Sequence, residues 1–93
     1  MDPKSNSGSS ISHPTHYAEN GIEPREYIRA NNLPFNEGNI VKYITRHNMK
    51  DGVKDIVKVL TYGIFILEDD YDFTQEDVSK VLSDIMANTK HRR

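Results

Sequence analysis

The stretch Asn36-Glu37-Gly38-Asn39-Ile40-Val41-Lys42-Tyr43-Ile44-Thr45-Arg46-His47 decides the fold expected for this chain of 93 residues. A helix turns by 100° per residue, so a helix over this stretch has two unlike sides. The side expected to face a core carries Ile40, Val41 and Ile44. The opposite side carries polar groups spaced three and four residues apart, which are Asn39, Lys42 and Arg46. We predict an amphipathic helix here, capped by Asn36 and ending at about Arg46.

Three further helices are predicted around this one. A short helix is expected over Ile22–Ala30, with Pro24 in its first turn. A longer helix is expected from about Gly52 to Leu67, with Asp51 as its cap, followed by a loop over residues 68–72. Its core stripe follows three-four spacing and contains Val53, Ile56, Val57, Leu60, Ile64 and Leu67. The last amphipathic helix is expected to begin at Thr74, because the sequence Thr74-Gln75-Glu76-Asp77 is close to a capping box.

These elements predict an all-α fold, a small helical hairpin or bundle of about four helices. Residues 1–12 are polar and rich in Ser and Gly, so we expect an extended, mobile N-terminal arm there and a single helical domain over residues 13–93. A core of this size stabilises a fold only marginally. The helix expected near residues 52–67 is also apolar on its far side, which favours a homo-oligomer.

The composition excludes several classes of protein. The chain has no cysteine, so disulfide scaffolds, cysteine-ligated zinc and thiol catalysis are excluded. Its net charge of −2 argues against nucleic acid as a partner. We expect a soluble, cytoplasmic protein, because the sequence has neither an apolar run of membrane-spanning length nor an N-terminal signal segment.

No motif for catalysis or metal binding stands out. The glycine-rich phosphate-binding loop is absent, so phosphate chemistry here depends on side chains and helix N-termini. His13 and His16 flank a proline and lack the fixed register of zinc-binding pairs, so we predict no metal site. No serine or threonine lies in a recognisable nucleophile turn, and we assign no catalytic residue.

A cluster of charged residues is the best candidate site. Lys42 and Arg46 lie one helical turn apart, and Asp55 and Lys58 follow at matching spacings on the next helix. An antiparallel hairpin brings the two sets together, so that Asp55 pairs with Arg46 or Lys42. The same pattern is typical of a solvated, salt-bridged surface. An anion site and a solvated surface both remain open on spacing alone.

Four blocks of sequence carry a resemblance to a known family. In order, they are His13-Pro14-Thr15-His16-Tyr17, Gly21-Ile22-Glu23-Pro24 with Tyr27-Ile28, Phe35 to Arg46, and Gly52 to Lys58. They resemble a family of small bacteriophage proteins, formerly of unknown function and often labelled phage nucleotide kinase. The resemblance runs from residue 13 to about residue 62 and departs from the family pattern after Lys58.

The resemblance implies a phage-encoded protein that handles a nucleotide in the cytoplasm of a host bacterium. The best-known member of that family is similar to a deoxynucleoside monophosphate kinase that works without a phosphate-binding loop. Carried over by position, the ligand-binding residues are His13, His16, Tyr17, Asn39, Lys42, Tyr43, Arg46, Asp55 and Lys58, with Glu23 as a further polar position.

Three hypotheses follow for the function. In the first, the chain is a nucleoside monophosphate kinase that uses ATP and Mg²⁺, with Asp55 or Glu23 positioning the metal. In the second, it sequesters a host immune signal without chemistry, for example a cyclic oligonucleotide or an ADP-ribose derivative. In the third, its helices dock on a host protein as an inhibitor. The first two share the binding of a nucleotide or another phosphorylated small molecule.

Overall fold

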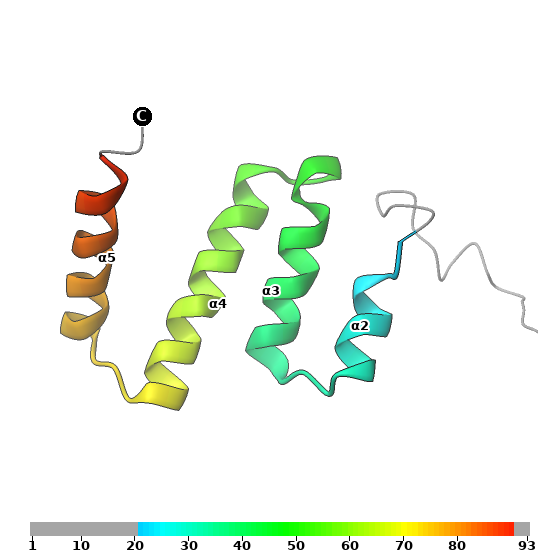
Figure 1. Cartoon of the computed structure of the whole chain (residues 1–93), viewed down its shortest axis with the longest axis horizontal. Coiled ribbons are helices and arrows are strands. Elements are labelled where there is room, and N and C mark those ends of the chain that lie inside the picture. Colours follow the sequence, from blue (N-terminus) through cyan, green and yellow to red (C-terminus); the bar gives the residue numbers. More distant parts are fainter. Residues whose placement is uncertain (1–20, 91–93) are drawn as a thin grey trace, which may run out of the picture.

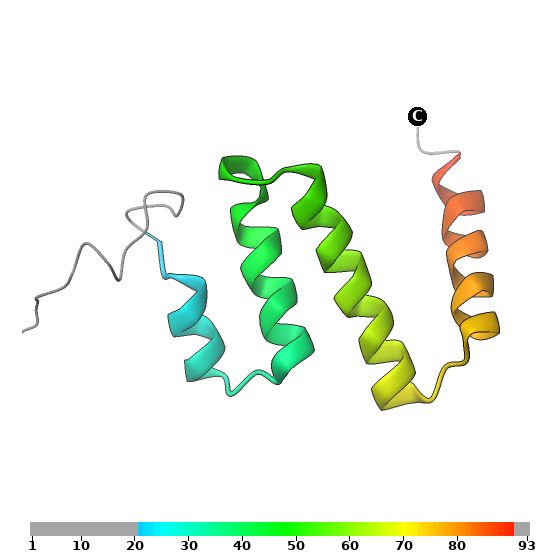
Figure 2. The ribbon, with the colours of Figure 1, turned by 180° about the vertical axis from the view of Figure 1, so that it is seen from behind.

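The computed structural model describes residues 21–90 of the chain. Over this range the chain forms four α-helices and one short 3₁₀ helix, with no strand, so the all-α prediction is confirmed. Figure 1 shows the helices side by side in chain order, and Figure 2 shows the same order from behind. The elements are α2 (Pro24–Ala30), α3 (Phe35–Arg46), η1 (His47–Met49), α4 (Val53–Tyr71) and α5 (Gln75–Thr89). The predicted arm over residues 1–12 lies outside the described range.

Helix α3 begins earlier than the sequence predicted. Its N-cap is Pro34, and the Gly38 N–H donates to the Pro34 carbonyl oxygen at 2.8 Å. This bond already closes a first turn, so the prediction of Asn36 as the cap was wrong. Gly38 is buried where α2 and α3 meet, and a Cβ added there would lie 3.3 Å from Ile28 Cγ2. The absence of a side chain at Gly38 therefore sets how closely α2 packs on α3.

Helices α3 and α4 form an antiparallel hairpin through η1 and a tight turn. The N-cap of α4 is Gly52, at φ 54°, a left-handed conformation that favours glycine. Asp51 is therefore not the cap that was predicted, because it is drawn instead into contacts with Arg46 and Asp55.

The predicted loop over residues 68–72 was also wrong, since α4 continues to Tyr71. The helix ends at Asp72, which adopts a left-handed conformation at φ 58°. The Phe73 N–H then donates to the Leu67 carbonyl oxygen at 3.0 Å, as at a Schellman-type helix end. The acidic side chains of residues 68–70 are compatible with a helix, so their charge did not mark a break.

Part of the apolar stripe that was predicted to form the core side of α4 is exposed. Asp55 and Tyr62 of α4 contact α3, whereas Val53, Val57 and Leu60 of the predicted core stripe are exposed. On α3 the order is similarly reversed, because Ile44 is exposed and Arg46 is buried. Periodicity shows which residues share a face, but on a helix that is apolar nearly all round it does not show which face meets a neighbour.

Helix α5 begins with the predicted capping box. The Asp77 N–H donates to Thr74 Oγ1 at 3.1 Å, and the Thr74 N–H donates to Asp77 Oδ2 at 2.9 Å. Val78, one residue further on, is the one hydrophobic side chain in residues 21–90 that is classed as buried. The described part of the chain is thus a single layer of helices with little enclosed core.

Candidate functional site

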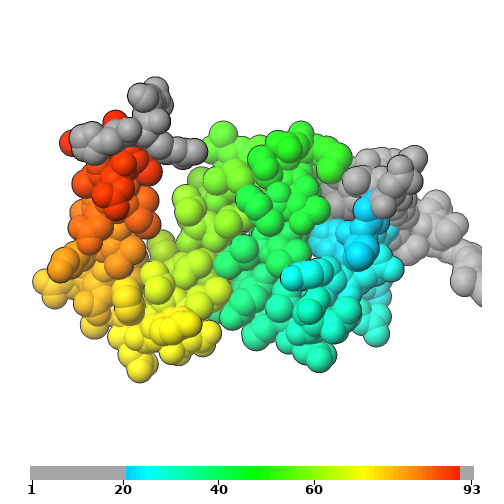
Figure 3. All heavy atoms as spheres, in the orientation of Figure 1, coloured from blue at the N-terminus to red at the C-terminus, as the bar shows by residue number. Residues whose placement is uncertain are grey.

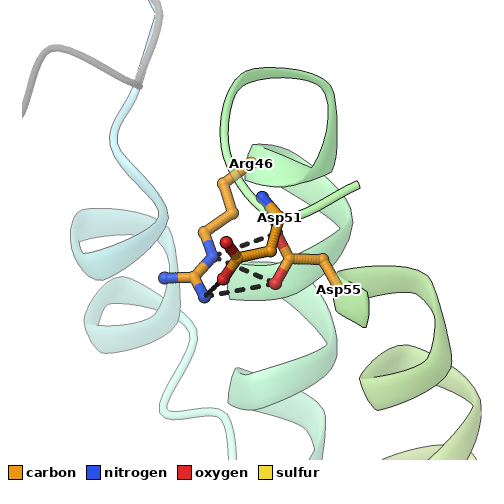
Figure 4. A network of polar contacts seen from close by, with 3 residues as sticks. All are labelled: Arg46, Asp51 and Asp55. Atoms are coloured by element: carbon orange, nitrogen blue, oxygen red, sulfur yellow. Dashed lines mark hydrogen bonds and ion pairs between the residues drawn. The ribbon is translucent and has the colours of Figure 1, made fainter. Parts of the chain in front are cut away.

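A buried ion pair joins α3 to α4 at the closed end of the hairpin (Figure 4). Asp55 is fully buried, and Arg46 is 9% exposed. Arg46 Nε donates to both Asp55 oxygens at 3.3 Å, and its Nη2 donates to Asp55 Oδ1 at 3.1 Å. Arg46 Nη2 also reaches Asp51 Oδ2 at 3.4 Å, while the Asp51 N–H donates to Asp55 Oδ2 at 3.2 Å. The predicted pairing of Asp55 with Arg46 is confirmed.

Both partners of this pair remain ionised. Burial by itself raises the pKa of Asp55, but the Arg46 hydrogen bonds and the Asp51 N–H outweigh it, and the pKa is lowered from its ordinary value. The Asp55 hydrogen bond in turn raises the pKa of Arg46. The charge of Arg46 is therefore matched inside the hairpin, and the pair holds the two helices in register.

Three cations surround the ring of Tyr43. Lys42 Nζ lies 5.1 Å from the ring centroid, Lys58 Nζ lies 4.7 Å away and Arg46 Cζ lies 4.7 Å away. The Tyr43 ring also stacks on Tyr62, with centroids 6.1 Å apart and planes at 7°. These contacts bring side chains of α3 and α4 to one aromatic centre.

The stacked pair continues into an aromatic row along the hairpin. Tyr62 meets Phe35 edge-on at 5.8 Å between centroids and meets Phe65 edge-on at 5.6 Å. Edge-on and offset-stacked arrangements are the favourable geometries for aromatic pairs. Tyr62 therefore packs on the Tyr43 ring from the α4 side and is itself contacted by Phe35 of α3 and Phe65 of α4.

An open groove of about 240 Å³ lies between α2 and α3, next to this centre. Its walls are mainly apolar, with an amide and an ammonium among them. Asn39 Nδ2 donates to the Phe35 carbonyl oxygen at 2.9 Å, and the Asn39 side-chain oxygen accepts no hydrogen bond from residues 21–90. The lining residues are Ile28, Leu33, Pro34, Phe35, Gly38, Asn39 and Lys42.

The structure brings most of the predicted site residues to one region. Tyr43, Lys42, Arg46, Asp55 and Lys58 meet at the hairpin, and Lys42 with Asn39 also lines the groove. The predicted residues His13, His16 and Tyr17 lie outside the described residues. Glu23 is the N-cap of α2, and its backbone N–H donates to Glu26 Oε1 at 3.1 Å.

Sequence reasoning missed the apolar wall of the groove and the place of Asp51. Ile28 and Leu33 carry no chemical signal of their own, but a glycine inside a predicted helix, Gly38, marks a close approach by another element. Asp51 stands four residues before Asp55 and five after Arg46. This spacing could have predicted that a second carboxylate lies near Arg46.

Asp55, one of the two acidic residues proposed to position magnesium, does not fit that role in the hairpin. Both oxygens of the fully buried Asp55 accept hydrogen bonds from Arg46 or Asp51. Over the part of the chain that is described, no group of three or more His, Asp or Glu side chains is placed to hold a metal ion.

Among the described helices, none combines the length and the apolar character needed to cross a membrane.

Comparison with known proteins identifies the family and nothing more specific. No curated protein and no solved structure matches the chain. A family model described as a protein of unknown function, DUF3310, matches residues 11–63. The match includes α2, α3 and the first half of α4, which carry the ion pair, the Tyr43 centre and the groove, but not α5. Because the matched residues cover more than half of the chain, this protein belongs to the DUF3310 family.

Proposed function

We propose that the chain binds a nucleotide or a similar phosphorylated small molecule at Lys42 and the adjoining groove. The observation that carries the proposal is the position of Lys42, which lines the groove and lies beside the Tyr43 ring near Lys58. A phosphate at this point meets ammonium groups, while the groove offers apolar walls to the rest of the ligand.

The groove has the polar groups that orient a base. The Asn39 side-chain oxygen, which accepts no hydrogen bond within residues 21–90, is an acceptor for an amino group, and Asn39 Nδ2 has a second hydrogen beyond the one given to Phe35. Ile28, Leu33 and Phe35 supply apolar surface on which a ring packs. Few polar groups on an apolar wall are typical of small-molecule sites.

The ion pair supports this site without binding the ligand through its charge. Arg46 is compensated by Asp55 and Asp51, whereas Lys42 and Lys58 form no ion pair within residues 21–90. Of the three cations beside the Tyr43 ring, the two lysines are therefore the ones available to neutralise a phosphate. The Arg46–Asp55 pair fixes α3 against α4, so that both lysines stay beside the Tyr43 ring.

The size of the groove favours a single nucleotide. Its 240 Å³ is smaller than the range of about 300–1,000 Å³ for drug-sized ligands. A base with its sugar is of suitable size for it, with the phosphate outside at Lys42. A cyclic oligonucleotide would extend beyond one groove and would have to contact a second one.

The resemblance to phage nucleotide kinases supports a nucleotide as the ligand, and with it a phage-encoded protein acting in the bacterial cytoplasm. Catalysis is less well supported than binding, because Asp55 is held by Arg46 and Asp51 and is not available to a metal. This observation favours sequestration of a nucleotide over its phosphorylation.

Titration calorimetry of the full chain against each nucleoside monophosphate and deoxynucleoside monophosphate tests the proposal. Lys42→Ala should weaken binding by about 10- to 100-fold, the equivalent of one charge-assisted hydrogen bond. Lys54→Ala is the matched control, since Lys54 is an exposed lysine on α4 that does not line the groove. Equal affinities of the two variants, or no binding of any nucleotide, would refute the proposed site.

Recovery of the ligand separates sequestration from catalysis. The protein is incubated with the bound monophosphate, ATP and Mg²⁺, then denatured, and the ligand is identified by mass spectrometry. Unchanged monophosphate supports sequestration. Formation of diphosphate that Lys42→Ala abolishes shows a kinase, in which case a residue other than Asp55 positions the metal.

A further inference from the structure

Helices α4 and α5 diverge from the turn that joins them. Figures 1 and 2 show the two helices close together at this turn and far apart at their other ends. Figure 3 shows an open gap between them in the space-filling view. Helix α5 lies on the side of α4 away from α3. The gap between α4 and α5, hereafter the α4–α5 opening, is closed only near the turn.

The side of α5 that faces α4 becomes more exposed to solvent with distance from the turn. Val78, close to the turn, is 7% exposed. Leu82 and Ile85 follow on the same face, four and seven residues later, and are 42% and 48% exposed. Met86, at the edge of this face, is 65% exposed. One continuous apolar face thus passes from buried to open along the helix.

Helix α4 carries a matching apolar stripe on the other side of the opening. Asp55 and Tyr62 contact α3, and residues about half a turn away from them point to the opposite side of the helix. Those residues are Val53, Val57 and Leu60, which are 79%, 53% and 60% exposed. No charged residue interrupts the spacing of this stripe or of the α5 face.

We propose that a second copy of this chain fills the α4–α5 opening, with the α5 of each copy packed against the α4 stripe of the other. A two-fold dimer needs a self-complementary surface, and this opening presents both members of the contact in every copy. The 15 residues of α5 span about 22 Å, which is enough to cover the exposed stripe from Leu60 to Val53.

The exposed area agrees with what a stable dimer buries. The exposed fractions of the six side chains on the two stripes together equal more than three whole apolar side chains. This is roughly 500 Å² of exposed apolar surface per copy. A standard-size interface buries roughly 800 Å² per partner, and about 65% of a homodimer interface is apolar, which gives roughly 520 Å². A lone copy leaves this surface in water and has only Val78 as a buried hydrophobic residue in its described part.

The proposal is independent of the nucleotide site. Helix α5 lies outside the family match over residues 11–63, and the groove lies between α2 and α3. Loss of dimerisation and loss of ligand binding are therefore measured on different variants.

Sedimentation equilibrium of the full chain tests the dimer. Leu60→Asp and, separately, Leu82→Asp should raise the dimer dissociation constant by at least about 100-fold, because each places a carboxylate in the apolar contact. Ile44→Asp is the matched control, since Ile44 is 46% exposed on α3, and it should leave the constant within about threefold. Helical circular dichroism should be retained in all three variants. A monomer up to about 1 mM, or association that neither Leu60→Asp nor Leu82→Asp weakens, overturns the proposal.

Crosslinking distinguishes a second copy from closure of the opening within one chain. The sequence has no cysteine, so the double variant Leu60→Cys, Leu82→Cys carries the only two thiols. With a bismaleimide reagent, the proposal expects two chains joined to each other on a denaturing gel. A crosslink within single chains, or no crosslink in the associated protein, overturns it.

Discussion

Replacement of Arg46 by methionine should expose how much the hairpin depends on its buried ion pair. Methionine keeps much of the apolar stem of arginine but removes every hydrogen bond from the guanidinium to Asp55. Asp55, which is fully buried, then keeps a charge without a cationic partner in contact. Removal of one partner of such a pair costs about 3–5 kcal/mol of folding free energy.

This loss is large for a domain of this size. At about 0.05–0.15 kcal/mol per residue, some 80 residues have a total stability of roughly 4–12 kcal/mol. We therefore expect Arg46→Met to lower the melting temperature by about 12 °C or more, from about 4 °C for each kcal/mol. Urea unfolding followed by circular dichroism at pH 7 measures the free energy directly.

The double variant Arg46→Met, Asp55→Asn isolates the cause. If the unpaired charge is responsible, removal of that charge should recover much of the stability lost in Arg46→Met. The loss in Arg46→Met should also shrink at low pH, because without arginine the burial of Asp55 raises its pKa and the carboxylate takes up a proton. A loss below about 1 kcal/mol in Arg46→Met, or an equal loss in the double variant, would refute the reasoning.

Three further predictions concern stability. Gly63→Ala should raise the free energy of unfolding by about 0.5–1 kcal/mol, because a Cβ there meets no atom within 4 Å. Gly38→Ala should not raise it, because the Cβ would press on Ile28 of α2. Thermal unfolding compares the two variants. Thr74→Ala should lose about 1 kcal/mol with the α5 cap, measured by urea unfolding, and no loss would contradict the capping geometry. The pKa values of Asp55 and Asp77 are lowered in the folded chain, so both carboxylates contribute to the free energy of unfolding above the unfolded pKa of about 3.9. This contribution is lost as the pH falls from there through the lower folded pKa values. Urea unfolding at pH 7 and at pH 3 checks this, and equal stabilities would contradict it.

The presence and order of the four helices and one central contact could be predicted from the sequence. The spacing of Arg46 and Asp55 on two helices with a short connection predicts their pairing once an antiparallel hairpin is assumed. The Thr74 capping box could be read directly, because it depends only on local chemistry. Such features involve residues close in sequence or fixed by helical geometry.

What could not be predicted was the choice of face. Helix α4 is apolar on several sides, so hydrophobic periodicity alone did not show that Tyr62 would meet α3 and that Leu60 would be exposed. The cap at Pro34 and the left-handed end at Asp72 depend on backbone geometry that composition does not specify. The groove arises from two elements, and its apolar wall has no distinctive residue type.

The serial arrangement of the helices has a consequence for how the chain opens. Within residues 21–90, each α-helix packs only on the α-helices next to it in sequence. Coupling between helices is then nearly one-dimensional, as in a repeat protein. Within the described residues, α2 and α5 at the two ends each pack against one neighbouring helix only. Amide hydrogen exchange should therefore be slowest in α3 and in the residues of α4 that pack against α3. It should be faster in α2 and α5. The ion pair lies in the slowest region, so the Tyr43 centre stays assembled while the outer helices open and close around it.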